Sequence, residues 1–526
     1  MSDATSSAAQ EQFPDLIRNR MGQSSALVAA AGALIFSALV LGFLWGRTVN
    51  HDVAWYLIAT REWLGGARLY VDIYEVNPPL NFYLTAPAVF LADLTGIADG
   101  NALSAMICVW MFISLLASWT ILSRQDDLPT SRRLVFLFGV ALALFLPALR
   151  DIGQREQLMV IFATPWLLAQ LPRRERLSPL VTMALAAVAA VGICLKPYFL
   201  LLPLSVTLWQ VLSARSLRPV LSLGNLTMFT VGIAYVAAAY VLHPEYFSDV
   251  IPVARLVYGT IALSDEVLYR VLAFRALPFL PFAVILLVSR PDLPGIGVLA
   301  AATLAGLCSY FLQWNGFPYH LVPFSAFAVM TAFWVLVRVR SYTPLAMAAC
   351  IGLSLTAFRV VFFGPYKNGY VNALLAQTDP AWKPDGLMVL STQVMPGPPV
   401  ALALHTRWTS RYPHAWLIPG ALNGLQHTDC AVDKARCDQL TAILDRSRRE
   451  NVDDLVKGRP DILAIHKGTD FVDASTFSWY ELMRDVPGWA EALRDYKQMS
   501  SGQYFDIWLR CTGATGAIAA SCDAAK

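Results

Sequence analysis

The sequence contains little charge. Asp, Glu, Lys and Arg make up only 15% of its 526 residues, whereas hydrophobic residues make up 56%. Because a soluble globular protein carries about 25% charged residues, this composition excludes a chain folded mainly in water, and most of it must contact lipid. The 40 basic residues are nearly balanced by 37 acidic ones and form short clusters between apolar runs. Without a basic patch, no nucleic-acid partner is expected.

The N-terminus shows no signal-peptide cleavage site. The polar segment 1–24, which contains Arg18 and Arg20, leads into the apolar run 25–45. That run is about twenty residues long, which is enough to cross a bilayer, and no small-residue cleavage motif follows it. We therefore expect an uncleaved anchor with residues 1–24 in the cytoplasm.

The apolar runs predict about eleven transmembrane helices. A further run, 80–92, is short for a span and is broken by Asn81 and Pro87. If the segment 80–98 does not cross, the later arginine clusters share the side of the N-terminal tail, as the positive-inside rule demands; if it crosses, they all lie outside. We therefore expect a juxtamembrane or re-entrant element there. The expected spans are 25–45, 102–122, 134–149, 155–171, 178–195, 198–213, 219–242, 268–288, 296–312, 317–337 and 343–363.

Residues 364–526 have the composition of a soluble domain. Strand-like stretches at 387–390 and 462–465 alternate with charged helical segments, which predicts an α/β fold. An even number of cysteines without zinc-ribbon spacing predicts disulfides and hence an oxidising compartment, here the periplasm of a bacterial inner-membrane protein. The histidines of this domain, His405, His414, His427 and His466, are too scattered to predict a metal site. The disulfide candidates are Cys430, Cys437, Cys511 and Cys522, with the pairing left open.

Polar and aromatic corners gather on the predicted outer side, where they indicate a functional site. The first of these loops, 46–80, contains His51-Asp52, the runs Leu69-Tyr70-Val71-Asp72 and Pro78-Pro79, and between them a segment that we expect to form a helix in the membrane interface. Later outer corners contain Arg150-Asp151 and Tyr319-His320-Leu321-Val322-Pro323.

These motifs, in this order, resemble the GT-C superfamily of lipid-phosphosugar glycosyltransferases, which includes protein O-mannosyltransferases and the lipid A aminoarabinose transferase. The resemblance implies a mainly α, polytopic GT-C-type membrane module at 25–363, followed by a periplasmic α/β domain at 364–526. It implies transfer of a sugar from a polyprenyl-phosphate donor to a glycan, lipid or protein acceptor at the periplasmic face. It also implies that Asp52 and Asp151 are catalytic and could hold a divalent metal ion. The sequence departs from many relatives in having His51-Asp52 in place of two acids, and Asn77 in place of a lysine before the proline pair.

Such a transfer requires a base for the acceptor hydroxyl and cations for the departing phosphate. We expect Asp52 to be the base and Asp151 its partner, because two neighbouring acids raise one pKa. Lys196 and His320 are the expected phosphate ligands, with Arg61 and Arg155 as further candidates and Glu75 as a substrate-loop acid. Simpler roles remain open: helix capping for Asp52 and for Asp151 with Gln154, snorkelling for Lys196, and an aromatic-belt position for His320.

The main alternative is a transporter or flippase of lipid-linked sugars. Such a protein is expected to carry charged residues within its spans and internal repeats of broken helices. Neither feature is evident in the sequence. The position of the soluble mass after the last span also disfavours an O-antigen ligase or polysaccharide polymerase.

Overall fold

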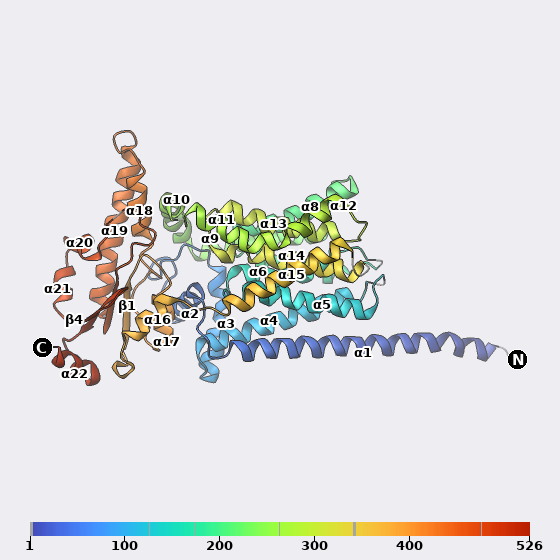
Figure 1. The fold of residues 1–526 in the computed structure, drawn as a ribbon, viewed down its shortest axis with the longest axis horizontal. Helices are drawn as coiled ribbons and strands as arrows, with labels where there is room; N and C mark the ends of the chain where they lie inside the picture. Colours follow the sequence, from blue (N-terminus) through green and yellow to red (C-terminus); the bar gives the residue numbers. More distant parts are fainter. Residues whose placement is uncertain are drawn as a thin grey trace.

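The computed structural model describes residues 4–125, 127–173, 175–261, 263–339, 343–474 and 476–525, with side chains from residue 23 onward. A bundle of long helices meets an α/β domain at one end, and the two chain termini lie at opposite ends of the molecule (Figure 1). We call the end of the bundle that contacts the α/β domain the domain end. The other end, which contains the turns at 123–129, 171–178, 215–222 and 290–295, is called the far end.

In the part of the chain that the structure describes, nine helices are long and apolar enough to cross a membrane. Two further expected spans are α6 (Arg155–Leu168) and α7 (Pro179–Ile193), which have only 14 and 15 residues. They are shorter than the roughly 20 residues that a bilayer core requires, and nearly every residue of α6 is buried among neighbouring helices. The nine long segments are Gln23–Leu44 (in α1, Ala4–Leu44), Asp99–Leu122 (α4), Thr130–Ala148 (α5 and η1), Pro197–Ala214 (η2 and α8), Leu223–Leu242 (α9), Asp265–Ser289 (α11, η6 and α12), Ile296–Gln313 (α13), Pro318–Arg338 (η7 and α14) and Pro344–Phe363 (α15).

The segment between α1 and α4 contains two helices, α2 (His51–Leu64) and α3 (Leu80–Thr95), and both lie at the domain end (Figure 1). The backbone N–H of Gly46, just after α1, donates to Asn101 Oδ1 at the start of α4 over 2.8 Å. The loop therefore starts and finishes at the same end of the bundle, as expected of a segment 80–98 that does not cross.

The helix α2 does not have the one-sided burial expected of an interfacial helix. Its residues 53–60 are all buried, because α3 packs on one side and α17 (Gly397–Ala403) of the C-terminal domain packs on another. The one-sided burial expected of this helix is therefore wrong, because the α/β domain covers a second face of it.

The C-terminal domain is built on a five-stranded sheet in the order β2-β1-β3-β5-β4. The strands β2, β1 and β3 are parallel, whereas β5 runs antiparallel to both β3 and β4. Disulfides join Cys430 to Cys437 and Cys511 to Cys522. The strands are β1 (Gly386–Leu390), β2 (Arg407–Trp408), β3 (Ile462–His466), β4 (Tyr496–Ser501) and β5 (Phe505–Arg510). The helices of this domain not yet given are α16 (Gly369–Ala376), η8 (Pro380–Trp382), α18 (Leu417–Gln426), α19 (Lys434–Gly458), α20 (Trp479–Met483), α21 (Trp489–Leu493) and α22 (Gly516–Ala524), and the segment before α11 forms η4 (Tyr246–Val250), α10 (Ile251–Val257) and η5 (Tyr258–Thr260).

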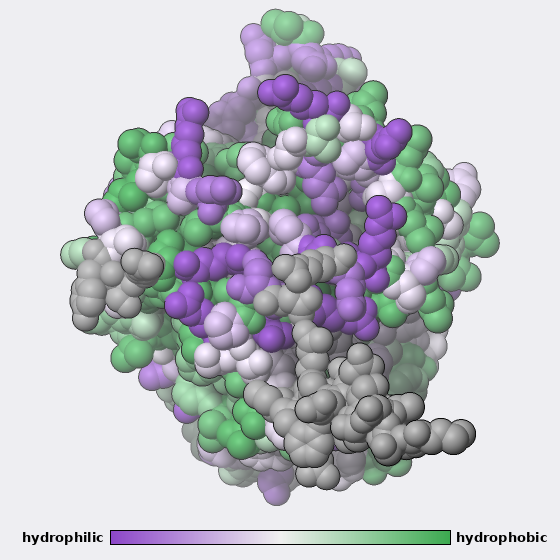
Figure 2. Space-filling view, turned by 90° about the vertical axis from the view of Figure 1, so that its right-hand side faces the viewer, coloured by the Kyte–Doolittle hydropathy of each residue, from purple (hydrophilic) through white to green (hydrophobic). Residues whose placement is uncertain are grey.

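The far end of the bundle carries the arginine clusters. Figure 2 looks at this end and shows hydrophilic side chains gathered near its centre with hydrophobic ones around them. Several arginines there bind the turns: Arg132 donates to the Val337 carbonyl over 3.0 Å, and Arg338 pairs with Asp127 at 2.6 Å. The basic residues thus lie at the end opposite the α/β domain.

Candidate active site

A cavity of about 390 Å³ lies between the domain end of the bundle and the α/β domain. Its bundle side is formed by the first loop, the corner before α6 and the segment 317–319. Its other side is formed by loops of the C-terminal domain. Asp52, Glu75, Asp151 and Arg155, all predicted site residues, line this one cavity.

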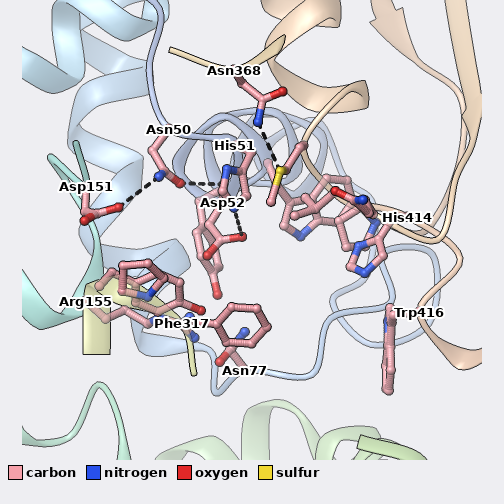
Figure 3. Close-up of a pocket in the computed structure, with 18 of the residues that line it drawn as sticks. Asn50, His51, Asp52, Asn77, Asp151, Arg155, Phe317, Asn368, His414 and Trp416 are labelled. Atoms are coloured by element: carbon pink, nitrogen blue, oxygen red, sulfur yellow. Dashed lines mark hydrogen bonds and ion pairs between the residues drawn. The ribbon is translucent and has the colours of Figure 1, made fainter. Parts of the chain in front are cut away.

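Asn50 and Gln154 join the two predicted catalytic acids, and Figure 3 shows Asn50 between Asp52 and Asp151. Asn50 caps α2 by accepting from the Asp52 backbone N–H, and its Nδ2 donates to Asp151 Oδ1 over 3.3 Å. Gln154 Nε2 donates to Asp52 Oδ2 over 2.8 Å and to Asn50 Oδ1 over 3.0 Å. The two acids are therefore neighbours connected through amides, without a direct contact between their carboxyl groups.

The corner that presents Asp151 is a tight turn. The Asp151 N–H donates to the Ala148 carbonyl over 2.7 Å, and Gly153 has a φ of 85°, which favours glycine. Gln154, not Asp151, is the N-cap residue of α6, and its side chain makes no capping bond. The capping role considered for Asp151 is therefore wrong, because its carboxyl group instead accepts from Asn50 and pairs with Arg275 at 3.5 Å.

The surroundings shift the pKa values of the two acids in opposite directions. Burial alone would raise the pKa of Asp52, but His51, Arg155, the Gln154 amide and Lys196 hold it below its ordinary value. Burial raises the pKa of Asp151 to about 6, against the opposing effect of Arg275. The Asp52 carboxylate, whose side chain is 20% exposed, is thus the acid that stays ionised to the lower pH.

Arg155 is a buried cation without a partner. The residue is only 4% exposed, and its Nε and Nη1 atoms have no hydrogen-bond partner among the described residues. Its guanidinium carbon lies 5.6 Å from the centre of the Tyr56 ring, at the wall of the cavity. Buried donors are nearly always satisfied in native proteins, so this arrangement indicates a binding site for an anion.

Lys196 and His320 are not among the residues that line the cavity. Lys196 Nζ contacts Glu156 Oε1 at 2.6 Å and His320 Nε2 at 3.3 Å. The ring of Tyr319, 5.2 Å from Lys196 Nζ, is the group that lines the cavity. Lys196 and His320 are both buried, so neither snorkels nor lies in an aromatic belt. Glu156 neutralises the charge of Lys196, which was expected to bind phosphate.

The two remaining predicted residues differ in position. Arg61 lies outside the cavity, where its guanidinium pairs with Asp93 at 2.6 Å and with Asp99. Glu75 lines the cavity and accepts from Trp55 Nε1 over 2.7 Å and from the Asn77 backbone N–H over 2.9 Å. Burial raises the pKa of Glu75, although Arg155 and these donors oppose the shift.

Sequence reasoning missed three residues of the cavity wall. Arg275 lies within the expected span 268–288, and a charged residue inside a span is itself a signal of function; it donates to the Pro147 carbonyl over 3.1 Å and pairs with Asp151. Tyr366 follows the last span and its hydroxyl lies 3.0 Å from His51 Nδ1. His414, to which the sequence assigned no role, reaches the cavity from the C-terminal domain, and only the docking of the two parts reveals it.

The carboxyl groups of the two predicted metal ligands already have partners in the protein. Within the described residues no group of three or more His, Cys, Asp or Glu side chains is placed to hold one. The oxygens of Asp151 are engaged by Asn50 and Arg275, and Asp52 Oδ2 is engaged by Gln154. The arginines beside these acids already supply the positive charge that a metal ion would bring.

Comparisons with known proteins agree with the fold. The structure is similar to that of ArnT from Cupriavidus metallidurans, solved bound to undecaprenyl phosphate, with a TM-score of 0.52, 13% identity and coverage of 94% of this chain and 98% of the other. It also matches the arabinofuranosyltransferase AftD from Mycobacteria with a TM-score of 0.38, 17% identity, and coverage of 94% and 42%. No family model matches the chain, and no curated protein matches its sequence.

The chain therefore has the fold of the ArnT structure, a bundle of apolar helices joined to an α/β domain, and the sequence predicted both parts. The likeness to ArnT extends over both the helical bundle and the α/β domain, since it covers nearly all of each chain.

Proposed function

We propose that the protein is a glycosyltransferase that moves a sugar from a polyprenyl-phosphate donor to a cell-envelope acceptor, namely lipopolysaccharide, a polysaccharide or a protein. The observation that carries this proposal is the cavity in which the ionised Asp52 carboxylate lies near the unpartnered Arg155 guanidinium. A base and an unoccupied buried cation are what the transfer requires. The ArnT structure, which shares the fold, was solved with undecaprenyl phosphate bound.

In the proposed reaction, an acceptor hydroxyl oxygen attacks the anomeric carbon of the donor sugar. A new bond forms between these two atoms while the bond from the anomeric carbon to the phosphate oxygen breaks, and its electron pair leaves with the polyprenyl phosphate. Asp52 accepts the hydroxyl proton. Arg155 stabilises the negative charge that develops on the phosphate, because its fork of N–H donors matches phosphate oxygens.

We place the cavity and the α/β domain on the periplasmic side of a bacterial inner membrane. The positive-inside rule supports this orientation, since the arginine clusters lie in and beside the turns of the far end. The two disulfides support it as well, because such bonds persist in oxidising compartments. The arginines concerned are Arg124, Arg132, Arg133, Arg173, Arg176, Arg215, Arg218, Arg290 and Arg338.

The proposal is tested with undecaprenyl phosphates carrying radiolabelled sugars, added to membranes that contain the full chain and candidate acceptors. Asp52→Asn is expected to reduce transfer by about 10²- to 10⁴-fold, the usual contribution of a general base, while donor binding persists. The matched control is Asp72→Asn in the same loop, because that side chain is 51% exposed and faces Arg68. Full transfer by Asp52→Asn would refute the assignment, and movement of intact donor across proteoliposomes without transfer would favour the transporter.

A further inference from the structure

Three loops of the C-terminal domain form the side of the cavity that faces away from the bundle. They follow the carboxyl ends of the parallel strands β1, β2 and β3, and they supply residues 393–395, residues 413, 414 and 416, and Phe471. In open α/β sheets, ligands bind outside the carboxyl ends of parallel strands. We call this set of residues the domain wall.

One atom in each of two polar side chains of the domain wall lacks a hydrogen-bond partner among the described residues. The Nδ1 atom of His414 and the Oε1 atom of Gln393 are buried and have no hydrogen-bond partner among the described residues. In Figure 3, Asp52 lies between Arg155 on one side and His414 on the other. A donor whose phosphate meets Arg155 would therefore extend past Asp52 toward His414.

The domain wall carries no formal charge among its described residues. Burial, opposed by Asp52 and assisted by His51, lowers the pKa of His414 to about 3, so its imidazole is neutral near pH 7. A neutral imidazole offers one donor and one acceptor, and a glutamine amide offers both as well, which suits hydroxyl groups. An ammonium or carboxylate group on the sugar would lose its hydration against this wall, whose own residues supply no countercharge, and that loss is costly.

Aromatic rings complete the domain wall. Trp416 stacks on Tyr74 of the first loop with ring centres 6.1 Å apart, and Phe471 packs edge-on against Phe317 at 6.3 Å. The Tyr74 backbone N–H also donates to the Arg411 carbonyl over 2.8 Å, which fixes the loop that carries His414. The rings and the polar atoms are therefore held in place before a ligand arrives.

We propose that the domain wall binds the transferred sugar, that this sugar is an uncharged hexose or pentose, and that His414 with Gln393 determines this specificity by positioning its hydroxyl groups. This assignment rests on the proposed function and deepens it: the membrane module binds the phosphate, and the C-terminal domain selects the sugar.

The test measures binding to the full chain in lipid nanodiscs by native mass spectrometry. The probes are undecaprenyl phosphate alone and undecaprenyl phosphates carrying mannose, arabinose, an amino-pentose or a uronic acid. We expect the two neutral sugars to tighten binding about tenfold over the bare phosphate, which corresponds to about 1.4 kcal/mol. The charged sugars should give no such gain.

His414→Ala is expected to abolish the gain from the neutral sugar and to leave affinity for the bare phosphate unchanged. His414→Gln, which keeps a neutral donor and acceptor, should restore part of the gain. The matched control is His427→Ala in the same domain, because His427 is exposed and pairs with Asp473 at 2.8 Å. Gln393→Ala provides a second variant should His414→Ala fail to fold.

Several outcomes would overturn the assignment. Tighter binding of the amino-pentose or uronic acid would contradict an uncharged sugar. An unchanged gain in both His414→Ala and Gln393→Ala would remove the domain wall from sugar binding, and an equal loss for the bare phosphate would show a structural role only. If the native chain binds none of the probes, including the bare phosphate, the proposed function fails and this assignment fails with it.

Discussion

The unpartnered state of Arg155 leads to a prediction in which stability and function change in opposite directions. Arg155 is 4% exposed, and two of its nitrogens lack partners among the described residues. Desolvating an unpaired charge is costly, whereas a hydrophobic side chain of similar length can fill the same space. We therefore expect Arg155→Met to stabilise the ligand-free protein by about 1 kcal/mol, because the nearby Asp52 and Glu156 carboxylates offset part of the desolvation cost of the guanidinium.

The same substitution should remove phosphate binding. A hydrogen bond to a charged group contributes about 1.5–3 kcal/mol, so losing a two-bond fork predicts a loss of affinity of about a hundredfold or more for undecaprenyl phosphate. At a ligand concentration of 100 times the Kd, the native chain gains about 2.7 kcal/mol from binding. Arg155→Met should gain almost nothing at that concentration.

The assay is thermal unfolding in nanodiscs with and without undecaprenyl phosphate. The matched control is Arg275→Met, because Arg275 is also buried but donates to the Pro147 carbonyl and pairs with Asp151. This control should lower the melting temperature in the absence of ligand, since it leaves a buried acid without its partner. The reasoning is refuted if Arg155→Met also melts lower than the native chain, or if undecaprenyl phosphate still stabilises it.

Three further predictions follow from the site and the C-terminal domain. Folding raises the pKa of Asp151 from 3.8 to about 6, so ionisation of this acid should lower the stability of the protein by about 3 kcal/mol as the pH rises from about 4 to about 7. Unfolding midpoints measured across this pH range should vary less in Asp151→Asn than in the native chain. An equal variation in both proteins would contradict the raised pKa. Treatment with EDTA should leave transfer unchanged. A loss of transfer that Mg²⁺ or Mn²⁺ restores would show that a divalent metal ion takes part in the reaction. Replacing Cys511 and Cys522 with serine, which opens a loop with a sequence separation of 11, should cost about 3 kcal/mol of stability; an unchanged melting temperature under oxidising conditions would argue against this bond.

The sequence predicted the helical bundle and the α/β domain because these depend on local patterns. Long apolar runs and strand-like stretches report burial along one segment at a time, and they placed the long spans and the β1 and β3 strands correctly. Span length was predicted less well for α6 and α7, and α6 is buried by its neighbours, so that it need not match the thickness of a bilayer.

The site was predicted in part. Asp52, Asp151, Glu75 and Arg155 line one cavity, as their shared side of the membrane suggested. The role of Lys196 could not be predicted, because a lysine at a corner looks the same in sequence whether it faces lipid headgroups or, as here, a buried glutamate.

Residues from distant segments escaped prediction for a different reason. His414 enters the cavity only because the C-terminal domain docks on the first loop, and a single sequence contains no pattern that reports such docking. Arg275 was detectable, since a cation in an apolar span is costly unless it is paired or functional.

The burial of α2 between the bundle and the C-terminal domain affects how the protein is made. Its covering helix α17 follows about 330 residues later in the chain, and at a synthesis rate of about 5–20 residues per second roughly 20–70 s separate the two. During this interval Asp52, in the first turn of α2, lacks the side of the cavity that the C-terminal domain forms. We therefore expect a chain interrupted before α17 to leave α2 uncovered and to lack the side of the cavity that the C-terminal domain forms.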